Sequence, residues 1–254
     1  MKFPNRFDKS ILKSSAKRRN RLCRKTKIQP QAANGKKRRK KMKKIITISR
    51  EYGSGGRIIG KKIAENLGYN FYDREIIDMA AEDSGLSPEF IEKTEQNISS
   101  GWLYNLLLGT SYAGTTAGAT TQQIGTQSLP LADQVFNAER KTILSLTDKP
   151  SVIVGRCADY ILRTSDTVDS KDLLNIFIYA DFDDKVKRIM ERQSMDEKAA
   201  RKAVQQVDKC RANHYNTFTE DTWGDRKIYD LLVNSSTLGI DQTIEMLTAF
   251  IQKT

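Results

Sequence analysis

Short apolar runs and amphipathic segments alternate along the chain from residue 45 to its end. The apolar runs are rich in Ile, Val, Leu and aromatic residues, and near-continuous runs of this kind are typical of strands in a parallel sheet that is covered on both faces. The runs expected to be strands are residues 45–49, 69–72, 151–155, 173–179 and 228–233.

The segments between these runs have helical features. Residues 57–67 place Ile59, Ile63 and Leu67 on one helical face, and Gly68 then acts as a stop signal. Strands separated by helices predict an α/β fold, a parallel five-stranded sheet flanked by helices. Further helices are expected after Asp73-Arg74 through Ala81, from the Ser-Pro-Glu at 87–89, at 131–146, after the acids of 181–184, after the capping box at 194–197, and at 239–251.

Periodicity is lost in residues 99–130, which are rich in Ser, Thr, Gly and Gln. A loop of this length inside a compact domain is uncommon unless it is a functional lid or a mobile insertion. The sequence does not separate these two interpretations, and we expect a mobile segment at about 99–130.

Charge divides the chain into two unlike parts. Residues 1–44 carry 19 Lys and Arg residues against the single acid Asp8, whereas the remaining residues are net acidic. With few periodic apolar residues, residues 1–41 are expected to be a disordered basic tail ahead of one domain at 42–254. The tail suits binding of nucleic acid or anionic lipid, and it also suits an organellar transit peptide. A third interpretation is that translation starts at Met42 and that the tail is upstream sequence or an accessory extension.

Several classes of protein are disfavoured. No apolar stretch reaches the roughly 20 residues that span a bilayer, and the tail lacks the apolar core of a secretory signal. The three cysteines, Cys23, Cys157 and Cys210, are isolated, which argues against a disulfide framework or a zinc site and suits a reducing compartment. His214 is the only histidine, so a His-rich metal centre is excluded. These features predict a cytoplasmic protein that does not bind membranes through an apolar segment.

The first expected strand runs directly into a glycine-rich turn. Gly53, Gly55 and Gly56 can adopt the positive φ angles that let backbone N–H groups converge on a phosphate, beside the positive end of the following helix. The P-loop consensus ends in Gly-Lys-[Ser/Thr], whereas this turn reads Gly-Gly-Arg-Ile at 55–58. The pattern therefore predicts a phosphate cradle without its usual lysine, and the alternative is a tight turn with no ligand.

Two further polar pairs also follow expected strands. Asp73-Arg74 ends the second strand, and Gly155-Arg156 ends the third. Ligands of parallel α/β sheets bind beyond the carboxyl ends of the strands. We therefore expect both pairs and the glycine turn to face one crevice.

Four ordered motifs resemble those of the cytidylate kinase-like family, a branch of the P-loop nucleoside monophosphate kinases. They are ISREYGSGGR at 48–57, NFYDREII at 70–77, VIVGRCADYIL at 152–162 and WGD at 223–225. The resemblance covers nearly everything after residue 42. It implies transfer of the γ-phosphoryl group of ATP, with Mg²⁺, to CMP or dCMP.

The glycine turn supplies the expected ATP site. Arg57, at the mouth of the helix beside the position of the missing lysine, is the first candidate for stabilising the transferring phosphoryl group. Arg50 is expected to share this task, or to form a salt bridge with Glu51 instead. The residues expected to bind ATP are Arg50, Gly53, Ser54, Gly55, Gly56, Arg57 and Ile58.

The resemblance also implies an acceptor site. Arg156 is similar to the family's arginine that holds the substrate phosphate, and Asp73 and Arg74 match the edge of the monophosphate site. Asp159 is a candidate for orienting ribose or magnesium-bound water, or else a structural acid at a helix start. Three residues resemble the lid that closes over both phosphates, with Arg188 and Arg211 expected to be catalytic and Asp208 to bind the acceptor.

The chain also departs from the family pattern. Ile58 replaces the hydroxyl residue that usually serves Mg²⁺, so only Ser54 or water remains as a loop ligand. The arginine expected several residues after the second-strand aspartate is absent around Asp78-Met79. Two alternatives to a kinase therefore stay open: a nucleotide-binding protein that has lost turnover, and a nucleic-acid-associated protein that acts through residues 1–44.

Overall fold

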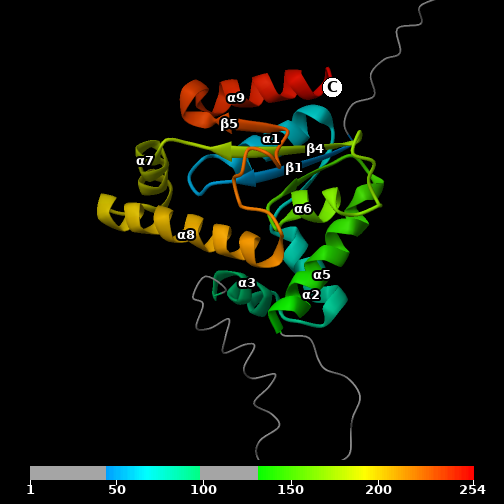
Figure 1. Ribbon diagram of the computed structural model, residues 1–254. Coiled ribbons are helices and arrows are strands. Elements are labelled where there is room, and N and C mark those ends of the chain that lie inside the picture. Colours follow the sequence, from blue (N-terminus) through cyan, green and yellow to red (C-terminus); the bar gives the residue numbers. More distant parts are fainter. Residues whose placement is uncertain (1–43, 98–130) are drawn as a thin grey trace, which may run out of the picture. The chain divides into compact units, whose positions relative to one another are not determined.

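The computed structural model describes residues 44–97 and 131–254 of the chain (Figure 1). The expected basic tail at 1–41 and the expected mobile insertion at 99–130 lie outside the described residues. Within them, no helix is long and apolar enough to cross a membrane.

The sheet is five-stranded and entirely parallel, which confirms the predicted α/β architecture. Its strands lie in the order β2-β3-β1-β4-β5. Because every crossover between parallel strands is made through a helix, all carboxyl ends meet at one edge of the sheet. The strands are β1 (Ile45–Arg50), β2 (Asn70–Tyr72), β3 (Ser151–Val154), β4 (Leu173–Tyr179) and β5 (Leu231–Asn234).

Helices cover both faces of the sheet (Figure 1). Helices α1 and α9 pack together on one face, and α5 and α6 pack together on the other, with α2 against α5. The helices are α1 (Gly56–Leu67), α2 (Glu75–Ser84), α3 (Pro88–Asn97), α5 (Leu131–Ser145), the short 3₁₀ turn η3 (Leu146–Asp148), α6 (Ala158–Arg163), α7 (Phe182–Gln193), α8 (Glu197–Phe218) and α9 (Ser235–Ile251).

The alternation of side chains along β1 divides the core into two halves. Ile46 and Ile48 face α1 and α9, whereas Ile45 packs into the cluster of α2, α5 and α6. Thr47 is also buried, and its hydroxyl donates to Oδ1 of Asn175 on the adjacent strand at 2.6 Å. The central strand is therefore fully enclosed, and its far end is fixed in position to carry the glycine turn.

Three element boundaries differ from the sequence expectation. The last strand begins at Leu231, because Ile228 closes a turn by donating its N–H to the Asp225 carbonyl oxygen at 3.1 Å. Asp196 caps α8 by accepting from the Ala199 N–H, whereas Ser194 adopts a left-handed conformation that ends α7. Helix α9 starts at Ser235, and a non-helical residue lies inside it at Gly239, where the sequence had placed the helix start.

Candidate phosphate and acceptor site

The glycine turn between β1 and α1 has the backbone geometry of an anion cradle. Gly53 and Gly55 have φ angles of 81° and 80°. A Cβ atom at Gly53 would lie 2.8 Å from the Lys185 carbonyl oxygen, so a side chain there would collide with α7. The N-cap residue Gly55 makes no side-chain cap bond and no acid lies in the first turn of α1, although Oγ of Ser54 accepts the Gly56 N–H at 3.4 Å. The helix therefore presents its N-terminal dipole to an incoming anion.

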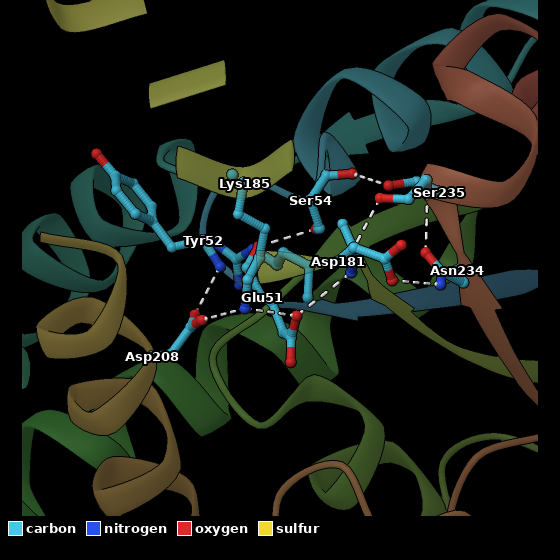
Figure 2. A network of polar contacts seen from close by, with 12 residues as sticks. Glu51, Tyr52, Ser54, Asp181, Lys185, Asp208, Asn234 and Ser235 are labelled. Atoms are coloured by element: carbon cyan, nitrogen blue, oxygen red, sulfur yellow. Dashed lines mark hydrogen bonds and ion pairs between the residues drawn. The ribbon is translucent and has the colours of Figure 1, made fainter. Parts of the chain in front are cut away.

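A buried lysine connects this turn to the helices beside it (Figure 2). The Lys185 Nζ atom, on α7, lies 2.8 Å from Oε2 of Glu51 and 3.0 Å from Oδ2 of Asp208. Asp208, on α8, also accepts the backbone N–H of Tyr52 at 2.6 Å. Glu51 is thus bonded to α7 through the ammonium group, and Tyr52 is bonded to α8 through Asp208, which the same ammonium group contacts.

Sequence reasoning did not identify Lys185. Burial lowers the pKa of its ammonium group, but the hydrogen bonds and charges of Glu51 and Asp208 outweigh burial and raise it. The two carboxylates therefore stabilise the charged form of the lysine. The available signal was its position in the buried stripe of α7, four residues before Ile189, where a lysine needs a partner.

Arg188, expected to be catalytic, lies between the glycine turn and the start of α9. It donates to the Gly53 carbonyl oxygen at 3.2 Å and to Oγ of Ser235 at 3.2 Å. Ser235 in turn donates to the Ser54 carbonyl oxygen at 2.7 Å (Figure 2). In this geometry, Arg188 fixes the glycine turn to the start of α9.

The turn itself contains no ready-made magnesium site. The Ser54 side chain is fully buried, and its hydroxyl donates to the Glu51 carbonyl oxygen at 2.8 Å. Ile58 is 51 % exposed and offers only hydrocarbon. Among residues 44–97 and 131–254, no three His, Cys, Asp or Glu side chains gather to hold a metal ion. These residues do not fit a protein-held Mg²⁺, and Ser54 remains a metal ligand only as a prediction.

Asp73 joins two of the predicted cations. Its Oδ2 atom lies 2.7 Å from Nε of Arg57, and its Oδ1 atom lies 3.3 Å from Nη2 of Arg50. The Arg57 side chain is 63 % exposed, whereas that of Arg50 is 20 % exposed. Arg57 is therefore free to leave Asp73 for a ligand at small cost, since exposed ion pairs contribute little.

Arg156 is held by the carboxylate of Glu139, which was not among the predicted site residues. Its Nη1 atom donates to Oε1 of Glu139 at 2.6 Å, and its Nε atom donates to the Asp73 carbonyl oxygen at 3.4 Å. Glu139, on α5, is 0 % exposed. Arg156 thus anchors the β3 turn to α5 and to the end of β2.

Gly155 permits a close contact between the turns after β1 and β3. Its φ angle is 80°, and a Cβ atom there would lie 1.7 Å from Nη1 of Arg50. Because any side chain would displace the guanidinium, the glycine lets Arg50 pack directly against the turn after β3.

A cavity of about 620 Å³ opens at the carboxyl edge of the sheet, beside these arginines. Three guanidinium groups line it, those of Arg50, Arg156 and Arg211. Arg211 donates to the Arg50 carbonyl oxygen at 3.1 Å, and burial lowers its pKa, although arginine keeps its proton in proteins. Helix α8, which carries Arg211, and Trp223 complete the lining. A cavity lined by three arginines and by the aromatic side chains of Tyr215 and Trp223 is suited to a phosphorylated organic molecule.

The other acceptor candidates do not line this cavity. Arg74 pairs with Glu92 at 2.8 Å and is 65 % exposed. Asp208 lies under the glycine turn, as described above. Asp159 is 1 % exposed and accepts from Oγ of Ser49 at 3.1 Å and from the Tyr215 hydroxyl at 2.6 Å. The structure therefore favours a structural role for Asp159 over contact with ribose.

Asp159 leads to a prediction on pH dependence. Burial raises the pKa of its carboxyl group more than the hydrogen bonds of Tyr215 and Ser49 lower it. A raised folded-state pKa means that the folded protein keeps the proton longer than the unfolded chain. This carboxyl group therefore destabilises the fold increasingly as the pH rises from the unfolded value of about 3.9 to the folded value.

We expect the stability of Asp159→Asn, relative to wild type, to improve as the pH rises through this window. Urea unfolding of both proteins from pH 4 to pH 7 measures the difference, which cancels the carboxylates that the two share. A difference that stays constant with pH would show that the buried carboxyl group has an unshifted pKa, and a difference that falls would show a lowered one; either result contradicts the prediction.

Comparison with known proteins identifies the family of the chain. Residues 45–237 match the cytidylate kinase-like family, and the chain belongs to that family. A cytidylate kinase of Methanopyrus kandleri is 23 % identical over 212 residues, which cover 82 % of this chain and 92 % of the relative.

Two solved structures extend the comparison. An uncharacterized protein from Eubacterium ventriosum is 26 % identical, with a TM-score of 0.58, and the match covers 83 % of this chain and 99 % of that one. A shikimate kinase from Bacteroides thetaiotaomicron is 13 % identical, with a TM-score of 0.42, and the match covers 82 % and 98 % of the two chains.

Proposed function

We propose that this protein transfers the γ-phosphoryl group of ATP to a nucleoside monophosphate, with CMP or dCMP as the first candidates. The observation that carries the proposal is the meeting of a glycine-rich anion cradle with a cavity lined by three arginines at one edge of the sheet. Membership of the cytidylate kinase-like family supports the reaction class, and the cytidylate kinase of M. kandleri supports the choice of acceptor.

The proposed roles follow from where each cation lies. The backbone of the glycine turn and the N-terminus of α1 bind the β- and γ-phosphates of ATP. The cavity arginines bind the acceptor phosphate, one of whose oxygens attacks the γ-phosphorus. The bond from that phosphorus to the β-bridging oxygen breaks, and ADP leaves. The acceptor oxygen is already ionised, so the protein has to supply positioning and positive charge, not a general base.

Arg57 has the position and the freedom to follow the transferring group. We expect Arg57→Ala to lower kcat by about 100-fold while changing the KM for ATP little, because a cation that acts on a dispersed transition-state charge contributes mainly to kcat. Arg57→Lys is expected to recover part of the rate, since it restores charge without the bidentate fork. Steady-state kinetics test this, and full activity in Arg57→Ala would remove Arg57 from the catalytic role.

A nucleotide-binding protein without turnover is the second candidate. It is favoured by the absent loop lysine and by the contact of Arg57 with Asp73, which turns this cation away from its proposed task in the free protein. ATP binding with no phosphoryl transfer to any monophosphate would select it.

A coupled assay of ADP release separates the two candidates. The wild-type protein is incubated with ATP and each nucleoside monophosphate in turn, with and without Mg²⁺. We expect release to depend on CMP or dCMP and on Mg²⁺, which arrives bound to the nucleotide. A rate that no monophosphate raises above the ATP-only background would contradict the proposal.

A further inference from the structure

The thiol of Cys157 and the imidazole of His214 meet in the cavity, and the proposed transfer uses neither. The Cys157 Sγ atom lies 3.6 Å from Nδ1 of His214. Both residues line the cavity that also contains the three arginines. A thiol in contact with an imidazole is the arrangement in which a cysteine is activated as a nucleophile, because the imidazole accepts the thiol proton.

The turn after β3 presents this thiol to the cavity. Gly155, Arg156 and Cys157 have consecutive φ angles of 80°, 55° and 52°, all in the left-handed region. Two non-glycine residues in this region cost free energy that packing has to offset. The sharp turn directs the chain back into α6 immediately after the strand, with Cys157 at its bend. Cys157 and Arg156 are thereby both placed in the lining of the cavity.

The cavity supplies positive charge near Cys157 and His214 and a route by which a reagent reaches the thiol. Cys157 is only 4 % exposed, so a reagent reaches it through the cavity and not from the outer surface. Arg50, Arg156 and Arg211 line the same cavity and supply positive charge, and the thiolate is the reactive form of cysteine. Cys210 lines the same cavity and is less buried, whereas the thiol in contact with Nδ1 of His214 is that of Cys157. Cys210 therefore serves as an internal reference for the reactivity of Cys157.

We propose that Cys157 and His214 form a hydroperoxide-reactive site whose oxidation closes the acceptor cavity. The thiolate sulfur attacks the distal oxygen of the hydroperoxide, a sulfur–oxygen bond forms and the oxygen–oxygen bond breaks. His214, which took the thiol proton, returns it to the leaving oxygen. The products are a sulfenic acid at Cys157 and one molecule of water or alcohol. The added oxygen lies beside Arg156, where it competes with an acceptor phosphate.

The expected loss of acceptor use after oxidation rests on the proposed function, whereas the oxidation of Cys157 itself does not. The primary readout is therefore chemical. The full-length protein is treated with hydrogen peroxide and dimedone, which traps sulfenic acids, and peptide mass spectrometry measures the labelling rate of each cysteine. We expect Cys157 to be labelled at least about 10-fold faster than Cys210, although exposure alone predicts the reverse order.

A variant tests the role of the imidazole. His214→Gln is expected to lower the Cys157 rate to about that of Cys210, since the proton acceptor is lost. Gln206→Ala, which alters the same cavity wall, serves as the control and is expected to leave the rate unchanged. The wild-type comparison of the two cysteines stands even if His214→Gln does not fold.

The possible outcomes separate the two levels of the proposal. Equal labelling of Cys157 and Cys210 in the wild type, or an unchanged Cys157 rate in folded His214→Gln, would overturn the reactive pair. Rapid labelling of Cys157 that leaves CMP-dependent ADP release unaffected in an active protein would overturn the closure of the cavity. Rapid labelling in a protein with no kinase activity would support the pair and contradict only the proposed function.

Discussion

Arg156→Ala is expected to lower the free energy of unfolding by about 3 kcal/mol, because it removes the cation that faces a fully buried carboxylate. Glu139 is 0 % exposed and lies 2.6 Å from the arginine. Loss of one partner from a buried pair costs far more than the pair contributes, since the remaining charge stays in a region of low polarity.

A second substitution isolates this effect. Glu139→Gln in the Arg156→Ala background removes the buried charge, so the double variant is expected to recover part of the lost stability. Arg163→Ala is the matched control, because Arg163 makes a comparable contact with Asp221 but is 37 % exposed. Its cost should not exceed about 1 kcal/mol. Urea unfolding measures all three, and a loss in Arg156→Ala no larger than that in Arg163→Ala would contradict the buried pair.

Lys185→Met is expected to weaken ATP binding by about 10-fold, or about 1.4 kcal/mol, and to destabilise the fold. Lys185 is the cation between Glu51 and Asp208, and both carboxylates lie next to the glycine turn. Without the ammonium group, the two carboxylates repel each other and also repel the phosphates of ATP. Asp208 also loses the partner that holds it against the Tyr52 N–H.

The neighbouring lysine of α7 provides the control for this prediction. Lys187 is exposed, so Lys187→Met removes the same charge from the same helix without touching the turn. Calorimetric titration with ATP and a thermal melt should separate the two variants. If both bind ATP equally well, Lys185 does not organise the cradle.

The fold and the glycine turn could be predicted because their signals are local. The apolar run of β1, the glycines after it and the helical face of α1 all lie within about 20 consecutive residues. The parallel pairing of the strands follows from the helices between them, whereas their order in the sheet was not predicted. The start of β5 was placed too early because Ile228 is apolar, yet the turn from Asp225 decides its conformation.

The support of the site could not be predicted in the same way. Lys185 lies 134 residues from Glu51 in the sequence, and their contact exists only after the sheet has formed. Glu139 likewise resembles any acid of an amphipathic helix until α5 packs beside the β3 turn. For Asp159, helix position alone left two roles open, and only its burial and its bond with Tyr215 distinguish them. Charged residues in this fold acquire roles from partners that the sequence does not place together.

The most direct test of the account follows the phosphoryl group itself. ATP labelled at the γ-phosphate is incubated with the wild-type protein, Mg²⁺ and CMP, and the products are separated by chromatography. Unlike ADP release, this measurement distinguishes transfer from hydrolysis. We expect the label to appear in CDP in proportion to the ADP formed, with little released as inorganic phosphate. Label that remains in ATP, or that is released only as inorganic phosphate whichever monophosphate is supplied, would contradict it.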